Sequence, residues 1–342
     1  MKINSTASWA ILLSVIIALL YAGQSIIVPF VVALLIWFVV KKVRDLLDKV
    51  EFIERYVPTF VKTLLASILI FTVLVLTGRL LTVNIENLAA SFQDYSENVV
   101  VIAKQINSTV DVNIEAELKE IVSTDNVSAY LQLLFNSISG LLGNMVMILF
   151  YTLFLFIEEG LFRNKMHLLF DSQEKYEQFN GTLKKIEKML SRYIALKSLV
   201  NLSTAFLGYI VLYLVGIDSP FFWAVVIFFF SFIPSIGPII ATTVTACFSL
   251  LQFGDFVPCA IILFGIGSIQ LVIGNYMEPR LMGNTLNISP LVAVLSLAVW
   301  GALWGITGML LSVPITVAII IILAQSNSTR PVAVLLSEKG KL

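Results

Sequence analysis

Long apolar stretches, separated by short charged ones, run through most of the chain, which is the pattern of a polytopic membrane protein. Residues 7–40 contain no charged side chain, but one helix of that length would extend about 50 Å across a hydrocarbon core of about 30 Å. Gly23 and Pro29 therefore predict two short apolar helices, at residues 7–22 and 26–40. Four later stretches are each long enough to span a bilayer: residues 62–83, 141–157, 198–216 and 257–275.

Two further apolar runs, both in the last third of the chain, contain residues that interrupt helices. The first, residues 222–252, is broken by two prolines and a glycine within residues 234–238. The second, residues 290–323, is broken by Gly301, Gly305 and Gly308. The halves of both runs, about 12 to 16 residues each, are too short for a comfortable span. Both runs are therefore predicted to form re-entrant or broken helical hairpins, which need protein or water around their exposed backbone.

Charge is sorted along the chain and predicts its orientation. Two clusters of Lys and Arg, at residues 41–62 and 163–197, are placed in the cytoplasm by the positive-inside rule, as are both termini. Residues 84–140 hold eight acidic side chains and only two lysines, so they are predicted to form amphipathic helices on the outer side. Within the second basic cluster, apolar residues recur every three or four positions between residues 179 and 194. They predict an amphipathic helix, either at the inner membrane surface or packed on a neighbouring helix in water.

Composition supports the same class. Of the 342 residues 58% are hydrophobic and 13% charged, and a mean hydropathy of +0.94 is too high for a soluble domain. The net charge is zero, so nothing points to nucleic acid as a partner. His167 is the only histidine and the two cysteines lie in apolar runs, which argues against a metal site and Ser-His-Asp catalysis. No GxxxxGK[ST] motif occurs. We therefore predict no enzymatic activity and no cofactor.

These patterns predict an all-α polytopic membrane protein with about five to six spanning helices plus the two hairpins. The predicted domains are N-terminal membrane helices at 1–83, an extracytoplasmic helical segment at 84–140, a membrane helix with a cytoplasmic amphipathic helix at 141–197, a transport domain at 198–327 and a cytoplasmic tail at 328–342. Residues 1–197 would form a scaffold and 198–327 the moving part. The hairpins would enter from opposite faces, as in an alternating-access carrier.

The best candidate for function is the stretch 275–283, Asn-Tyr-Met-Glu-Pro-Arg-Leu-Met-Gly. Between residues 219 and 329 the only charged side chains are Asp255, Glu278 and Arg280. Charges in so apolar a region are costly unless they pair, reach an interface or line a wet cavity. Glu278 and Arg280 are interpreted either as an interfacial ion pair or as a gate or substrate contact. Pro279 between them is predicted to end the helix and free backbone groups for a ligand.

Uncharged polar residues at helix breaks or inside spans suit a neutral ligand, because they offer hydrogen bonds without a net charge. Bonding between helices is the simpler reading for each. Asp255 is interpreted as interfacial or as a second candidate, after Glu278, for proton coupling, and Trp300 and Trp304 as interfacial anchors rather than a stacking platform for a ligand. The predicted substrate or coupling residues are Glu278, Arg280, Asn275, Gln270, Ser235, Pro234, Gly237, Pro238, Ser312, Pro314 and Asp255.

Four blocks of the last third also resemble the signature motifs of the autoinducer-2 exporter family, which consists of bacterial inner-membrane permease-like proteins. These blocks are Phe232-Ile-Pro-Ser-Ile-Gly237, Glu278-Pro-Arg-Leu-Met-Gly283, Leu295-Ser-Leu-Ala-Val-Trp-Gly301 and Gly308-Met-Leu-Leu-Ser-Val-Pro314. They stand in the family's order and spacing, and the layout of the whole chain fits.

The resemblance implies export of autoinducer-2, a small polyhydroxylated quorum-sensing signal, by a homo-oligomer, a pentamer in this family. Because some members are assigned to sodium or lithium/proton antiport, the resemblance leaves a monovalent cation or proton as the alternative cargo. A membrane scaffold protein without transport of its own is the alternative from another class. The lipid bilayer is a partner in every case.

Overall fold

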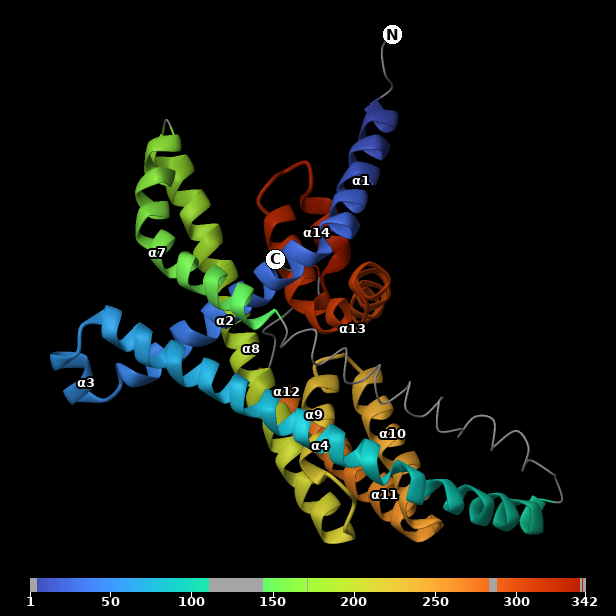
Figure 1. The fold of residues 1–342 in the computed structure, drawn as a ribbon. Helices are drawn as coiled ribbons and strands as arrows, with labels where there is room; N and C mark the ends of the chain where they lie inside the picture. Colours follow the sequence, from blue (N-terminus) through green and yellow to red (C-terminus); the bar gives the residue numbers. More distant parts are fainter. Residues whose placement is uncertain (1–4, 111–143, 171, 283–287, 339, 341–342) are drawn as a thin grey trace. The chain divides into compact units, whose positions relative to one another are not determined.

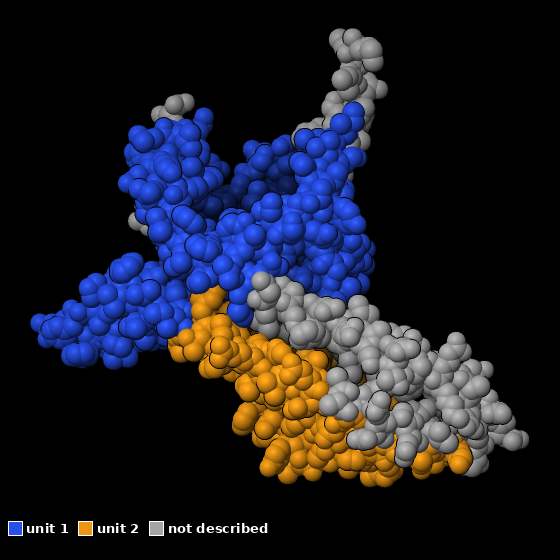
Figure 2. Space-filling model, viewed as in Figure 1, with its two compact units in different colours: residues 1–68, 143–194, 286–342 blue, residues 69–142, 195–285 orange. Residues whose placement is uncertain are grey.

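The computed structural model describes residues 5–110, 144–170, 172–282, 288–338 and 340. Over these residues the chain is helical, apart from one isolated antiparallel bridge between Ile288 and Ser337 (Figure 1). Seven helices in the described part are long and apolar enough to cross a bilayer, which confirms the predicted all-α polytopic class. The chain divides into two compact units, residues 1–68, 143–194 and 286–342, and residues 69–142 and 195–285 (Figure 2).

The first unit holds α1 (Ser5–Ala22), α2 (Gln24–Leu47), α3 (Glu51–Tyr56) and α7 (Met145–Leu169). Gly23 separates α1 from α2, as predicted. The helix predicted at residues 26–40 is present but is not short: α2 has 24 residues, contains Pro29 in its second turn and is long enough to span. Pro29 removes one backbone hydrogen bond without ending the helix, and Lys and Arg are good helix formers, so α2 continues through the basic cluster. α2 packs along α7.

The same unit contains the second broken run, α13 (Pro290–Leu323), followed by α14 (Arg330–Leu336). Its helical geometry fails at Trp304 and Gly305, where φ reaches +61°. The chain folds back at this point and brings the two arms of α13 close together. A Cβ on Gly308 would lie only 1.9 Å from the carbonyl oxygen of Trp300. Only glycine allows so close an approach of the two arms. The predicted break of this run is therefore confirmed.

Trp300 and Trp304 belong to the core beside this turn. Both indoles are buried and packed together, and their N–H groups donate to the Thr316 hydroxyl and the Leu20 carbonyl. Their interpretation as interfacial anchors is wrong, since a buried indole with a satisfied N–H stabilises the fold instead.

The second unit holds the short helix α9 (Pro220–Phe230) and the two longer helices α10 (Ile236–Phe253) and α11 (Phe256–Val272). α11 is continued by the π-helical turn η1 (Ile273–Met277) and the short helix α12 (Glu278–Met282). α10 packs against both α9 and α11 (Figure 1). The predicted break of the first run is confirmed, but its halves are unequal, with 11 residues in α9 and 18 in α10. α10 alone is long enough to span, because Pro238 falls in its first turn, where no backbone N–H is needed.

Two long helices run from one unit into the other. α4 (Thr59–Val110) contains the predicted span at 62–83 and continues as a helix to residue 110. α8 (Gln173–Val215) joins the predicted amphipathic helix and the predicted span at 198–216 in one 43-residue helix. The rest of the outer segment, residues 111–140, lies outside the described residues. The division into a scaffold at 1–197 and a moving part at 198–327 concerns motion and stays a prediction, as do the outside and inside assignments.

Candidate functional site

The turn between α9 and α10 in the second unit has a constrained backbone. Ser235 has φ +60° and ψ −45°, a conformation that a residue with a Cβ rarely adopts. A Cβ on Gly237 would lie 1.8 Å from the carbonyl oxygen of Phe230, so the end of α9 approaches the start of α10 across a residue that must be glycine. Pro234, partly buried, precedes Ser235 and Pro238 follows Gly237. Strain of this kind persists where the surroundings enforce it, often at functional sites.

α8 holds this turn from one side. Asn201 is buried, and in the orientation that satisfies both of its amide atoms it accepts from the Phe232 N–H and donates to the Lys197 carbonyl oxygen, each over 3.3 Å. One helical turn before Asn201, the Lys197 side chain is only 9% exposed. The turn and a buried lysine are therefore fixed to the same face of α8.

Lys197 forms an ion pair with Glu278 of α12, with 2.6 Å between Nζ and Oε1. The Glu278 side chain is 29% exposed, so one member of the pair is buried and the other reaches the surface of the unit. The predicted pairing of Glu278 with Arg280 is thus corrected: Arg280 is exposed and has no ion pair among the described residues. The two are two positions apart on a helix, and such residues do not face each other.

The motif around Glu278 remains helical, so the prediction that Pro279 ends the helix is wrong. Residues 273–277 form a π-helical turn, and the Glu278 N–H bonds to the carbonyl oxygen of Ile273, five residues earlier. Hydrogen bonds in this wider turn span five residues instead of four, and the helix continues through Pro279 although proline has no backbone N–H to donate. Asn275 lies in it and is exposed. Single π-helical turns inside helices are frequent at functional sites.

Gln270 of α11 contributes a further buried amide to the second unit. Its Oε1 accepts a hydrogen bond from the buried hydroxyl of Thr242 on α10, over 2.9 Å. Its Nε2 is buried and has no hydrogen-bond partner among the described residues. A buried amide without a partner is destabilising by about 1–3 kcal/mol, so this N–H group is available to an acceptor that the chain itself does not supply.

The remaining predicted residues have structural roles or lie in the other unit. Asp255 caps α11 by accepting from the Val257 N–H over 3.0 Å. Ser312 and Pro314 lie in α13 of the first unit, where the buried Ser312 hydroxyl donates to the Met309 carbonyl. Ser235, Gly237, Gln270 and Glu278 therefore lie in the second unit, and Ser312 and Pro314 lie in the first.

Sequence reasoning missed Lys197 and Thr242. Lys197 was counted with the basic cluster at 163–197, although it stands directly before an apolar span and four residues before Asn201. A lysine at that position, on the same helix face as a buried polar residue, was the available signal.

Within the described residues, seven apolar helices are long enough to span a bilayer and two helices break at glycine turns. An ion pair with one buried member, Lys197, lies among the apolar helices of the second unit. These features define a polytopic membrane protein with polar groups inside an apolar unit. The chain belongs to the AI-2E family of transporters, whose profile, described as "AI-2E family transporter", matches residues 10–328.

The relatives are transport proteins of several bacteria. The chain is 27% identical over 327 residues to the AI-2 transport protein TqsA of Escherichia coli, covering 93% of this chain and 91% of TqsA. It is 27% identical over 335 residues to a Haemophilus influenzae protein named only by the general class of transport proteins, covering 95% and 93%. A Borreliella burgdorferi protein of the same general name is 34% identical over 229 residues, covering 67% of this chain and 63% of that protein.

Proposed function

We propose that this transporter exports a small neutral polar metabolite, with autoinducer-2 as the best candidate, across the cytoplasmic membrane of a bacterium by alternating access. The observation that carries the proposal is the set of polar features in the second unit: a self-neutralising ion pair, a buried amide with an unpaired donor and a strained helix turn, each among apolar helices. The name of the E. coli relative TqsA adds support for the substrate.

The chemistry of the site favours a neutral solute with several hydroxyl groups. Lys197 and Glu278 cancel each other's charge, so a free ion would meet no net attraction there. A polyol can accept a hydrogen bond from the Gln270 Nε2 group or donate one to the Glu278 carboxylate, which is 29% exposed. Such a solute exchanges its water hydrogen bonds for protein ones without a buried charge.

The strained turn suits a moving element. Ser235 and Gly237 hold α9 and α10 in a conformation that the rest of the unit enforces. We infer that this turn shifts relative to Lys197 and Asn201 when the substrate site changes its access. Hinge positions of this kind are few and lie at the ends of elements.

Sodium or lithium/proton antiport is the second candidate, and the partly exposed Glu278 carboxylate favours it. A carboxylate next to a lysine can exchange a proton or a weakly held cation when the pair separates. In this alternative, Glu278 couples the movement of the cation to that of the proton. The Lys197–Glu278 ion pair is then the state in which no cation is bound.

Deleting the gene in a producing bacterium distinguishes the two candidates. Export predicts more autoinducer-2 inside the cells and less outside, restored by the wild-type gene but not by Glu278→Leu. Glu174→Gln, at an exposed position of α8 outside the site, should restore it. An unchanged distribution of the signal, together with sensitivity to sodium or lithium, would establish antiport instead.

A further inference from the structure

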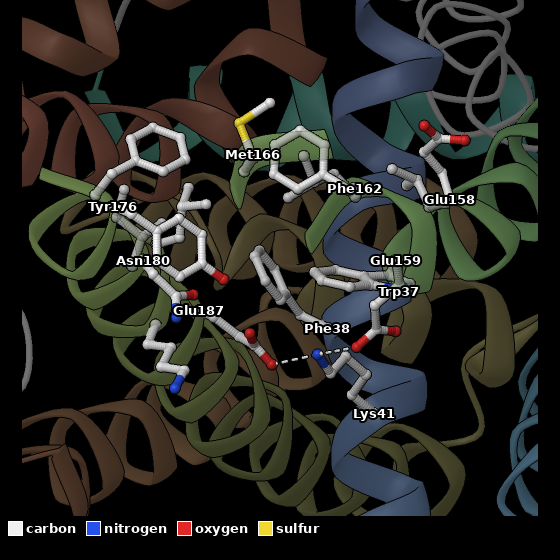
Figure 3. A pocket seen from close by; sticks show the side chains of 16 residues that line it. Trp37, Phe38, Lys41, Glu158, Glu159, Phe162, Met166, Tyr176, Asn180 and Glu187 are labelled. Carbon is white, nitrogen blue, oxygen red and sulfur yellow. Dashed lines mark hydrogen bonds and ion pairs between the residues drawn. The ribbon is translucent and has the colours of Figure 1, made fainter. Parts of the chain in front are cut away.

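The first unit contains a cavity of about 360 Å³ that is separate from the site described above. Its wall is formed by α2, α7 and the first half of α8, and it is mainly aromatic and aliphatic (Figure 3). The volume lies within the range of sites for small ligands, about 300–1,000 Å³.

One cation is already held in this wall. The Lys41 ammonium lies 2.8 Å from Glu159 and 2.5 Å from Glu187 (Figure 3). It also lies 4.3 Å from the centre of the Trp37 ring. A carboxylate pair and an aromatic face are the groups that stabilise an ammonium, so the wall has the chemistry of an ammonium site.

The charges around Lys41 do not balance. Two carboxylates share one ammonium, which leaves one negative charge in excess. Glu158 does not add to the excess, because it points away from Lys41 in Figure 3 and pairs with Lys165 over 2.5 Å. Lys184 of α8 also lines the cavity, is exposed and has no ion pair among the described residues. The cavity thus offers an unbalanced carboxylate and a free ammonium, which complement a zwitterion.

Trp37 provides a further observation that points to a ligand. It lines the cavity, and its indole N–H is buried without a hydrogen-bond partner among the described residues. Buried polar groups are nearly always hydrogen-bonded in proteins. An acceptor atom of a ligand, such as a phosphate or ester oxygen, would satisfy it.

The cavity lies where the apolar parts of two helices end. In α2 the apolar stretch ends at Val40, directly before Lys41, and in α7 it ends at Ile157, directly before Glu158 and Glu159. Leu34 and Leu155 line it on the apolar side of these boundaries. A ligand that fills it therefore has an apolar body and a charged head, like a lipid at the edge of the hydrocarbon region.

We propose that this cavity binds a zwitterionic phospholipid whose head carries a primary ammonium, the phosphatidylethanolamine class. Its ammonium donates to the Glu187 carboxylate, its phosphate pairs with Lys184, and Trp37 donates to an oxygen of the head or the ester. Its chains continue along Leu34 and Leu155. A primary ammonium is required because it can donate hydrogen bonds to the carboxylates, whereas a quaternary one cannot.

Quenching of tryptophan fluorescence by phospholipids with brominated chains tests the proposal on the purified full-length protein in phosphatidylcholine vesicles. The difference between the wild type and Trp37→Phe isolates the signal of Trp37. Brominated phosphatidylethanolamine should quench this signal at a mole fraction roughly three to ten times lower than brominated phosphatidylglycerol or phosphatidylcholine, as one charge-assisted hydrogen bond at a partly exposed site predicts. Equal quenching by all three lipids would overturn the proposal, and a preference for phosphatidylglycerol would assign the cavity to anionic lipids instead.

Glu187→Gln removes the excess charge and should abolish the preference, while Glu174→Gln on the exposed side of α8 should keep it. A preference that survives Glu187→Gln contradicts the proposed contact. Native mass spectrometry of the unmutated protein gives a readout without substitutions. Phosphatidylethanolamine adducts should outlast phosphatidylglycerol adducts at equal collision energy, and equal survival would also refute the proposal.

Discussion

Removing one partner of the Lys197–Glu278 pair should have unequal effects, because the two side chains are unequally buried. With only 9% of its side chain exposed, Lys197 cannot recover its hydration when Glu278 is replaced. We expect Glu278→Leu to lower the free energy of unfolding by about 3 kcal/mol, at the lower end of the range for a broken buried pair. Lys197→Met leaves Glu278 partly in contact with water and should cost less, about 1–2 kcal/mol.

The double variant Lys197→Met/Glu278→Leu tests whether the two residues act as a pair. It leaves no unpaired charge, so its loss should be at least about 1 kcal/mol smaller than the sum of the two single losses. Titration with sodium dodecyl sulfate in mixed micelles, followed by circular dichroism, measures the fraction folded. Arg280→Gln, two residues away and exposed, is the matched control and should change little. Additive single effects, or a loss in Arg280→Gln equal to that in Glu278→Leu, would refute the pairing.

Four further substitutions report on the turns, the amide and the orientation. Gly237→Ala should lower thermal stability sharply, since its Cβ would overlap the Phe230 carbonyl, and a Tm equal to wild type would contradict that geometry. Ser235→Gly relieves the positive φ and should raise the Tm by a few degrees, which differential scanning fluorimetry can measure. Gln270→Leu removes the unpaired donor and should reduce transport with little net change in stability, because relief of the unpaired amide offsets the lost hydrogen bond from Thr242; unaltered transport would exclude the amide from the substrate path. In a chain whose native cysteines are serines, Lys184→Cys should react with an impermeant maleimide only after the cells are opened, and labelling of intact cells would reverse the orientation.

The fold class and the broken helices were predictable from the sequence because they follow from local properties. Hydropathy and length define the spans, and the prolines and glycines of residues 234–238 and 301–308 interrupt helices in any surroundings. The precise limits were less predictable. The helices α2 and α8 continue through charged residues, because an apolar stretch limits the membrane-embedded part and not the helix itself.

The partner of Glu278 was not predictable, because Lys197 is 81 residues earlier in the chain. A contact over that separation depends on how α8 packs against the end of α11, which no local pattern reports. Pro279 gave a misleading signal for a related reason. Proline ends a regular α-helix, but a π-helical turn before it provides a different hydrogen-bond pattern that its sequence alone did not indicate.

We propose that this AI-2E family transporter moves a neutral polar solute through the unit that holds Lys197, Glu278 and Gln270. The most direct test of this proposal is uptake of labelled autoinducer-2 by vesicles reconstituted with the purified protein, in the presence and absence of sodium or lithium. We expect saturable uptake by the wild type that neither cation alters and that Gln270→Leu reduces at unchanged folding. No uptake above empty vesicles, with proton movement that depends on sodium or lithium, would contradict it.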